Sequence, residues 1–154
     1  MTRRILISLF ATLALAACSG ERASDERTAT GPTARALPEI APQPVRIGFD
    51  GPRFDACAGY GIVTNLNPDG NSYLAVRAAP NGSAEEIDRL APRQGVSMCQ
   101  QVGNWVGVVY ASGGVEGEGI ERCGTGSPVP RVREYDGPCK SGWVNENFIK
   151  LIAG

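Results

Sequence analysis

The sequence predicts an all-β domain built from short strands, and three observations lead to this expectation. The chain of 154 residues contains 20 Gly and 11 Pro, which favours many turns over long helices. Its apolar runs are short, and turn signals such as Asn67-Pro68-Asp69-Gly70 separate them. No stretch has the apolar spacing of an amphipathic helix of three turns. These features predict a barrel or sandwich of short strands.

The first expected strands lie between residues 60 and 78. Tyr60–Asn65 is rich in β-branched and aromatic residues, and Tyr73–Ala78 alternates apolar and polar positions. Pro80-Asn81-Gly82 marks the turn that follows. Ala84–Leu90 has apolar residues three positions apart, so we expect a short helical turn or a loop held against the core.

The second half of the expected sheet begins with a hairpin. Gly95–Val102 and Asn104–Tyr110 are expected as two strands joined by a tight turn at Gly103. The last apolar cluster of the chain comprises Trp143, Val144, Phe148 and Ile149. Trp143 and Val144 are expected in the core.

The beginning of the chain predicts export and lipidation. A basic start precedes an apolar stretch, residues 5–17, which is shorter than the about 20 residues of a membrane-spanning helix. The stretch ends in Leu15-Ala16-Ala17-Cys18, which resembles the lipobox of bacterial lipoproteins. This resemblance implies a signal peptide over residues 1–17 and Cys18 as the lipidation site. An ordinary secretory signal is the alternative.

Localisation follows from the same resemblance. A lipidated Cys18 implies the periplasmic face of the envelope of a Gram-negative bacterium, with the lipid as the anchor in the membrane. Ser19 follows the cysteine, where Asp commonly signals retention in the inner membrane. The outer membrane is therefore favoured over the inner one.

The mature chain is expected to consist of a tether and one domain. Residues 18–53 are interpreted as the lipidated cysteine followed by a disordered, Pro-rich tether, because this composition buries too little apolar area to offset its ordering entropy. The folded domain is expected over residues 54–154, beginning near Phe54. Its length suits a single domain.

Composition narrows the possible functions. The formal net charge is −1, from 15 Lys and Arg against 16 Asp and Glu, and it becomes −3 when Arg3 and Arg4 leave with the signal peptide. This balance lacks the basic stripe of nucleic-acid-binding proteins. Histidine is absent, which excludes Ser-His-Asp and Cys-His catalysis. We expect no enzymatic activity, no catalytic residue and no cofactor, because no motif brings two carboxylates together as a glycosidase pair.

A series of short signals identifies a family resemblance. In order they are Tyr73-Leu-Ala-Val-Arg-Ala-Ala-Pro80, Ile87-x-x-Leu90, Gly95-Val96, Gly103-Asn-Trp105, Val108 and Gly142-Trp-Val-Asn-Glu-Asn-Phe148-Ile149. Together they resemble the bacterial Src-homology-3-like domain over roughly residues 72–151. The resemblance implies a small Src-homology-3-like β-barrel. It covers neither the N-terminal strand extension around Cys57 nor the Gly-rich loop insertion, residues 111–141.

The four cysteines of the domain are expected to form two disulfides. Cys57, Cys99, Cys123 and Cys139 are even in number in an exported chain. The expected pairing is Cys123 with Cys139, which brackets the insertion, and Cys57 with Cys99, which ties the extension to the barrel. The other two pairings stay open. A four-thiolate zinc site is less favoured because close C-x-x-C pairs are missing, so no metal is expected.

The resemblance implies a binding module. In eukaryotic relatives a tryptophan at the place of Trp105 and an aromatic at the place of Phe148 line a groove for extended peptides. Trp105, Phe148, Tyr73 and Tyr110 are therefore the candidate ligand-binding residues, with core packing as the alternative for Trp105 and Phe148. Asn145 stands where those relatives carry a proline, which disfavours P-x-x-P ligands.

The expected ligand is a peptidoglycan stem peptide or an envelope protein. Glu85, Glu86 and Asp88 form an acidic cluster beside the implied groove, which either is solvated surface or attracts a basic group of a cell-wall peptide. Arg77 is expected in a structural hydrogen bond, with a role as a ligand clamp as the alternative. The second functional hypothesis is a protein inhibitor or regulator of an envelope hydrolase or lysozyme, acting through residues 111–141.

Replacing Cys18 with Ser is expected to release the protein from the membrane into the soluble fraction. The lipid is the one membrane attachment that the sequence predicts, and serine cannot accept it. Fractionation followed by a carbonate wash measures the release. A Cys18→Ser protein that stays with the membrane after the wash contradicts the lipid anchor.

Overall fold

The computed structural model describes residues 39–70, 72–113 and 119–154. The expected signal peptide and the lipidation site Cys18 lie outside these residues. Within the described residues, no helix combines the length and the apolar character needed to cross a membrane.

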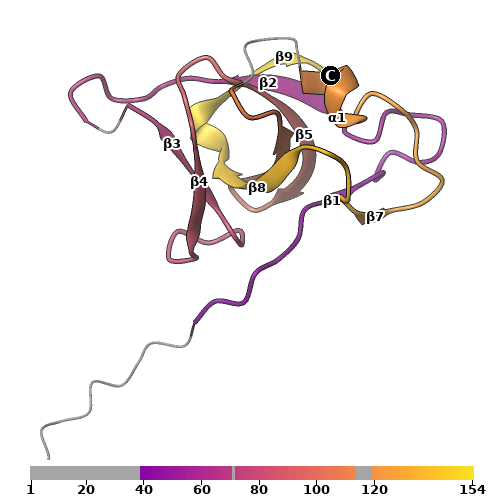
Figure 1. The fold of residues 1–154 in the computed structure, drawn as a ribbon, viewed down its shortest axis with the longest axis horizontal. Helices are drawn as coiled ribbons and strands as arrows, with labels where there is room; N and C mark the ends of the chain where they lie inside the picture. The colour runs from indigo at the N-terminus through magenta and orange to yellow at the C-terminus, as the bar shows by residue number, and fades with distance from the viewer. Residues whose placement is uncertain (1–38, 71, 114–118) are drawn as a thin grey trace, which may run out of the picture. The chain divides into compact units, whose positions relative to one another are not determined.

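The domain is all-β, as the sequence predicts, and most of its strands belong to one antiparallel sheet (Figure 1). This sheet contains β2 (Gly59–Val63), β3 (Leu74–Arg77), β4 (Glu86–Leu90), β5 (Gly95–Val102), β6 (Trp105–Tyr110), β8 (Lys140–Asn145) and β9 (Ile149–Ala153). The strand order is β4-β3-β8-β6-β5-β2-β9. A separate pair consists of β1 (Arg46–Ile47) and β7 (Arg133–Glu134), and the helical elements are α1 (Gly119–Cys123) and the 3-10 helix η1 (Glu146–Phe148).

The sheet winds around a shared interior but does not form the expected closed barrel (Figure 1). Its two edge strands are β4 and β9, and no ladder joins them in the part of the chain that the structure describes. A closed barrel requires every strand to have two hydrogen-bonded neighbours. The expectation of a barrel is therefore corrected to an open, strongly curved seven-stranded sheet.

The predicted hairpin is present, and one expected loop is a strand. Gly103 has a positive φ of 55° and lies in the tight turn between β5 and β6. Residues 86–90, expected as a helical turn or loop, form edge strand β4 and pair with β3. Ile87 is exposed while Leu90 is fully buried, because residues three apart in a strand face opposite sides of the sheet. The three-residue spacing of Ile87 and Leu90 therefore belongs to a strand with one exposed and one buried apolar residue, and not to a helical turn.

One face of the curved sheet surrounds an inner core. Its buried residues are Val63, Leu74, Val76, Leu90, Val96, Val106, Val108, Tyr110 and Val144. Within β6, Val106 and Val108 point to this face while Val109 points to the other, as the alternation of a strand requires. Val144 is fully buried here, in agreement with the sequence prediction.

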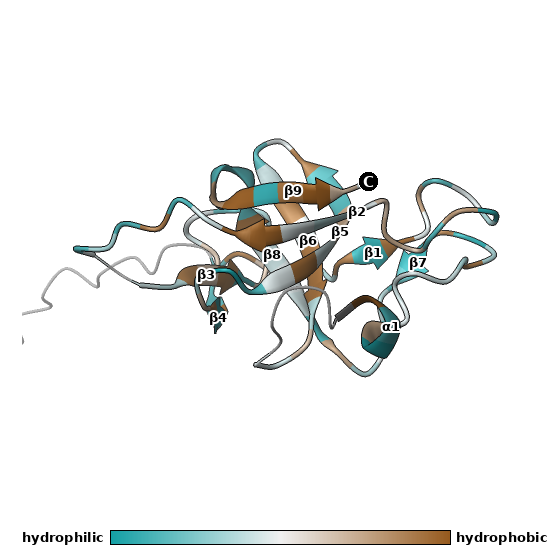
Figure 2. Ribbon diagram, turned by 90° about the horizontal axis from the view of Figure 1, so that it is seen from above, coloured by the Kyte–Doolittle hydropathy of each residue, from teal (hydrophilic) through white to brown (hydrophobic). Residues whose placement is uncertain are grey.

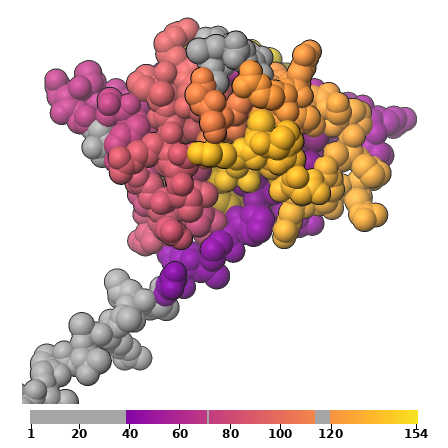
Figure 3. All heavy atoms as spheres, viewed as in Figure 1, coloured from indigo at the N-terminus to yellow at the C-terminus, as the bar shows by residue number. Residues whose placement is uncertain are grey.

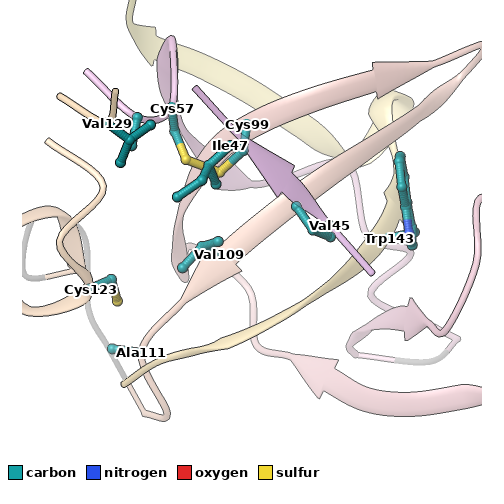
Figure 4. Close-up of a cluster of buried hydrophobic side chains, with 10 residues drawn as sticks. Val45, Ile47, Cys57, Cys99, Val109, Ala111, Cys123, Val129 and Trp143 are labelled. Atoms are coloured by element: carbon teal, nitrogen blue, oxygen red, sulfur yellow. A yellow bond between two sulfur atoms is a disulfide. The ribbon is translucent and has the colours of Figure 1, made fainter. Parts of the chain in front are cut away.

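The opposite face carries a second, outer core (Figure 4). Its buried residues are Val45, Ile47, Ala56, Cys57, Cys99, Val109, Ala111, Cys123, Val129 and Trp143. Trp143 and Val109 come from the sheet, and most of the others come from the N-terminal extension and the insertion. Figure 2 shows β1, β7 and α1 of these two segments together, at one end of the domain. The two segments outside the family resemblance thus cover one face of the sheet.

The folded domain begins earlier than the expected start near Phe54. Val45 and Ile47 are each 1% exposed, and β1 pairs with β7 of the insertion. The Gln43 carbonyl accepts a hydrogen bond of 2.7 Å from the Trp143 indole N–H. Figure 3 shows these first described residues, in indigo, against the yellow residues near the chain end. The expected tether over residues 18–53 is therefore wrong for residues 43–53, which are part of the domain.

Close packing explains why this segment belongs to the domain. Gly107 of β6 faces the outer core, and a Cβ at this position would lie 3.1 Å from Val45 Cγ1 and 3.2 Å from Gln100 Cβ. A glycine lets the extension approach the sheet, because any side chain here would push Val45 away. The extension also bonds to the insertion, since the Ala56 N–H donates to Ser127 O and the Cys57 N–H to Thr125 O.

Two disulfides hold the cover of the outer core in place, with the pairing that the sequence analysis favours. Cys57–Cys99 ties the extension to β5, and Cys123–Cys139 joins α1 to the residue before β8. Chain-entropy estimates for loops of these lengths are about 4 and about 3 kcal/mol. Tyr135 adds to the second link, because its hydroxyl donates to Cys123 O and accepts from the Cys139 N–H.

Replacing Ile47 with Ala is expected to lower the free energy of unfolding by about 2–5 kcal/mol, because the change leaves a cavity in the outer core. A residue in a disordered tether would show almost no effect. Gln43→Ala is the matched control, since its exposed side chain lies in the same segment and its backbone hydrogen bonds are retained. Urea unfolding at neutral pH measures both. Equal stabilities of the two variants would contradict the packing of the extension.

Candidate functional site

An open groove of about 360 Å³ brings together three of the four candidate ligand-binding residues. We call it the aromatic groove. Its lining residues are Leu66, Asn67, Gly70, Tyr73, Leu74, Ala75, Arg77, Gly82, Trp105, Asn145 and Phe148. They come from the connection between β2 and β3, from β3, from the connection between β3 and β4, from the start of β6, and from the end of β8 with η1. Tyr73, Trp105 and Phe148, which are distant in sequence, line the same surface.

Trp105 is the first residue of β6 and is half-buried. It pairs with Val102 of β5 and with Asn145 of β8, so its backbone is fixed on both sides. Its ring packs against the outer core and also lines the groove. Core packing and a position in the groove, the two alternatives for Trp105, are therefore both compatible with this one side chain.

Phe148 ends the 3-10 helix η1 and packs against the inner core while it lines the groove. Asn145 caps this helix, because its side-chain oxygen accepts a hydrogen bond of 3.0 Å from the Asn147 N–H. The Glu146 N–H donates to Asn104 O, and the Asn65 side-chain amide donates to Asn147 O. Asn145 thus holds the start of the short helix that ends at Phe148.

Tyr73 lies just before β3 on the rim of the groove. The Arg89 guanidinium carbon lies 4.1 Å from the centre of its ring, a cation–π geometry. Glu86 accepts a hydrogen bond of 2.6 Å from Arg89 Nε and so holds the guanidinium in place. The ring of Tyr73 is therefore covered by Arg89 on one side.

Tyr110 is not part of the groove, which corrects its assignment as a ligand contact. It is 2% exposed in the inner core, and its hydroxyl donates to Asp88 Oδ2 at 3.0 Å. Residues 105 and 110 of one strand differ by an odd number, so their side chains point to opposite faces of the sheet. Trp105 and Tyr110 of β6 accordingly contact different cores.

The acidic cluster is mostly paired within the protein. Asp88 accepts hydrogen bonds from Tyr110 and from Lys140, the latter at 2.9 Å, and Glu86 forms an ion pair with Arg89. Glu85, Glu86 and Asp88 are not among the groove residues. Two of the three carboxylates are therefore already paired, which disfavours the hypothesis that the cluster attracts a basic group of a ligand.

Two pKa shifts accompany this network. Burial acts to raise the pKa of Asp88, but hydrogen bonds from Lys140, the Arg89 N–H and Tyr110 outweigh it and lower the pKa from its usual 3.8. Burial and the charge of Asp88 raise the pKa of Tyr110. Tyr110 therefore stays protonated and donates, and Asp88 stays charged and accepts, so that β4, β6 and β8 are linked around the inner core.

A second open cleft, of about 500 Å³, lies elsewhere on the sheet. Phe49, Met98 and Leu151 supply most of its apolar lining, and Phe49 and Leu151 are largely exposed. None of the candidate ligand-binding residues lines it. In the described part of the chain, no group of three or more Asp, Glu or Cys residues is placed to hold a metal ion.

Comparison with known proteins found no match to this chain among family models, curated proteins or solved structures.

Replacing Asp88 with Asn is expected to lower the free energy of unfolding at neutral pH, because Lys140 loses its charged partner. Since the native pKa of Asp88 is depressed, its stabilisation is present above the usual value of 3.8 and is lost as the pH falls through the native pKa. Urea midpoints of the two proteins should differ at pH 7 and converge in acid well below 3.8. Glu85→Gln, a neighbouring exposed carboxylate, is the control. A difference that is constant over the whole pH range would contradict the ionic role of Asp88.

Proposed function

We propose that the domain is a peptide-binding module of a lipid-anchored envelope protein, and that its aromatic groove binds peptidoglycan stem peptides. The observation that carries the proposal is the meeting of Tyr73, Trp105 and Phe148 along one open groove. Trp105 and Phe148 are the positions at which the Src-homology-3-like resemblance implies ligand contact, and Tyr73 is a further candidate from the sequence. None of the three is adjacent to another in sequence.

The lining of the groove suits an extended peptide. Aromatic rings offer large, rigid apolar surfaces. The side-chain amides of Asn67 and Asn145 lie beside them, with their oxygens accepting from the Asp69 and Asn147 N–H groups and their NH2 groups as donors. A groove that is open along its length accepts a chain without enclosing it, which is the geometry of peptide recognition in aromatic-lined grooves. Asn145 in place of a proline supports a ligand other than a P-x-x-P segment.

We also propose the Src-homology-3-like architecture for the main sheet. Three features support it: the β5–β6 hairpin whose second strand begins at Trp105, the short 3-10 helix before the last strand, and a groove lined by that helix and by the β2–β3 connection. The sheet differs from a closed barrel because no ladder joins its edge strands β4 and β9 within the described residues. The extension and the insertion would be additions to this architecture.

The lipid anchor at Cys18 and the periplasmic location belong to the same proposal. Two disulfides in the domain support an oxidising compartment such as the envelope. A lipidated N-terminus would keep the groove within reach of the cell wall. The proposal includes no nucleic-acid partner and no cofactor.

The inhibitor hypothesis has less support than the groove. The described part of the insertion uses Cys123, Val129 and Tyr135 to pack against the outer core. Its backbone also pairs with the extension, through β7 and β1. A segment so engaged has a structural task, whereas the aromatic groove is open and has no such task assigned to it.

Replacing Trp105 or Tyr73 with Ala is expected to weaken binding to purified peptidoglycan by at least about tenfold, because aromatic anchors supply most of the binding energy in such sites. Cosedimentation of the full mature chain, kept soluble by Cys18→Ser, measures the affinity. Leu151→Ala is the matched control, since it removes an exposed apolar side chain outside the groove.

Thermal unfolding of each variant separates lost binding from lost folding. Tyr73→Ala removes a half-buried ring at the rim and is expected to melt close to the unaltered protein. Retention on naked peptidoglycan that neither variant weakens would overturn the groove assignment. Retention on envelope proteins alone would overturn the stem-peptide ligand and favour the inhibitor hypothesis.

A further inference from the structure

The aromatic groove carries a positive charge, the opposite sign to the one that the acidic cluster suggested. Among its lining residues, Arg77 is the one with a charged side chain. Two residues of the acidic cluster are engaged elsewhere: Glu86 with Arg89, and Asp88 with Lys140 and Tyr110. A chain whose formal net charge is −1 thus presents a cation in its best candidate ligand site.

The Arg77 side chain is held in place but not saturated. Arg77 ends β3, and its backbone pairs with Trp143 of β8 and Glu86 of β4. One terminal nitrogen of its guanidinium, Nη1, donates to Ala84 O at 3.2 Å. An arginine has five N–H donors, and within the described residues Arg77 has no carboxylate partner. The other donors make no hydrogen bond within the described residues, and Arg77 lines the groove.

This state of the guanidinium points to a definite ligand chemistry. Arg77 is half-buried, so water screens a charge bound there less than at the surface. A planar guanidinium with free donors matches the geometry of a carboxylate and binds it by two parallel hydrogen bonds. The bond to Ala84 O fixes the fork before the ligand arrives, which reduces the entropy lost on binding.

We propose that Arg77 binds a carboxylate of the bound peptide, and that the groove therefore selects stem peptides with free carboxylates over amidated ones. This inference rests on the proposed function of the groove. Tyr73 and Trp105 would contact the apolar parts of the peptide, and Arg77 would set its register. The neighbouring Arg89 is already paired with Glu86 and stacked on Tyr73, so it is not the anchor.

The test compares two synthetic stem peptides of the same sequence, one with free carboxylates and one with every carboxylate amidated. Calorimetric titration into the full mature chain with Cys18→Ser measures both affinities. The acidic peptide is expected to bind about tenfold to a hundredfold more tightly, the range for hydrogen bonds to charged groups. Arg77→Gln should reduce this preference to near one, and Arg77→Lys should keep part of it because a point charge remains.

The ratio of the two affinities is insensitive to folding effects, because destabilisation of a variant weakens binding of both peptides by the same factor. Arg89→Gln is the matched control and should keep the preference. Equal binding of both peptides, weakened in Trp105→Ala, would overturn the role of Arg77 and leave the groove in place. A preference that survives in Arg77→Gln would also overturn it. Failure of both peptides to bind, or binding that Trp105→Ala leaves unchanged, would overturn the function of the groove as well.

Discussion

Two strands of the sheet, β6 and β8, carry apolar side chains on both faces, and the rest of the structure depends on this constraint. Val108 and Val109 are adjacent and both buried, as are Trp143 and Val144. A curved sheet can enclose one face by itself, but the other face needs a separate cover. The extension and the insertion supply that cover. The disulfides restrict both segments to the face that they must protect.

The position of the groove follows from the two cores. Trp105 packs on the outer core and Phe148 on the inner core, and the groove lies where these two residues meet at the start of β6. Each aromatic is anchored by burying one part of its ring, and the other part stays open. Such partly buried rings lose little side-chain entropy when a ligand binds, because their rotamers are already fixed by packing.

Local patterns in the sequence predict much of this, and long-range pairings account for what they miss. The hairpin at Gly103 and the presence of two disulfides follow from turn chemistry and cysteine parity, and three of the four candidate ligand-binding residues line the groove. The burial of Val45 and Ile47 was not predicted, because they lie in a proline-rich stretch and their apolar alternation is too short to indicate a strand. The sequence could have shown that Tyr110 and Trp105 face opposite sides of the sheet, because they are five residues apart in one expected strand. The sequence does not show that Arg77 has no carboxylate partner, because this depends on Glu86 pairing with Arg89 and Asp88 with Lys140.

The cover of the outer core also reaches the proposed ligand anchor. Gln43 accepts the indole N–H of Trp143 and donates its own N–H to Ala78 O, so one residue of the extension holds both β8 and the end of β3. Ala78 directly follows Arg77, and its N–H in turn donates to Glu85 O. The guanidinium of Arg77 donates to Ala84 O, and Gln43 holds the backbone of the residue that follows Arg77. A small curved sheet without the extension would keep the groove aromatics but would lose one of the constraints on the charge beside them. The residues that seal the outer core therefore also hold the backbone at the end of β3, next to Arg77.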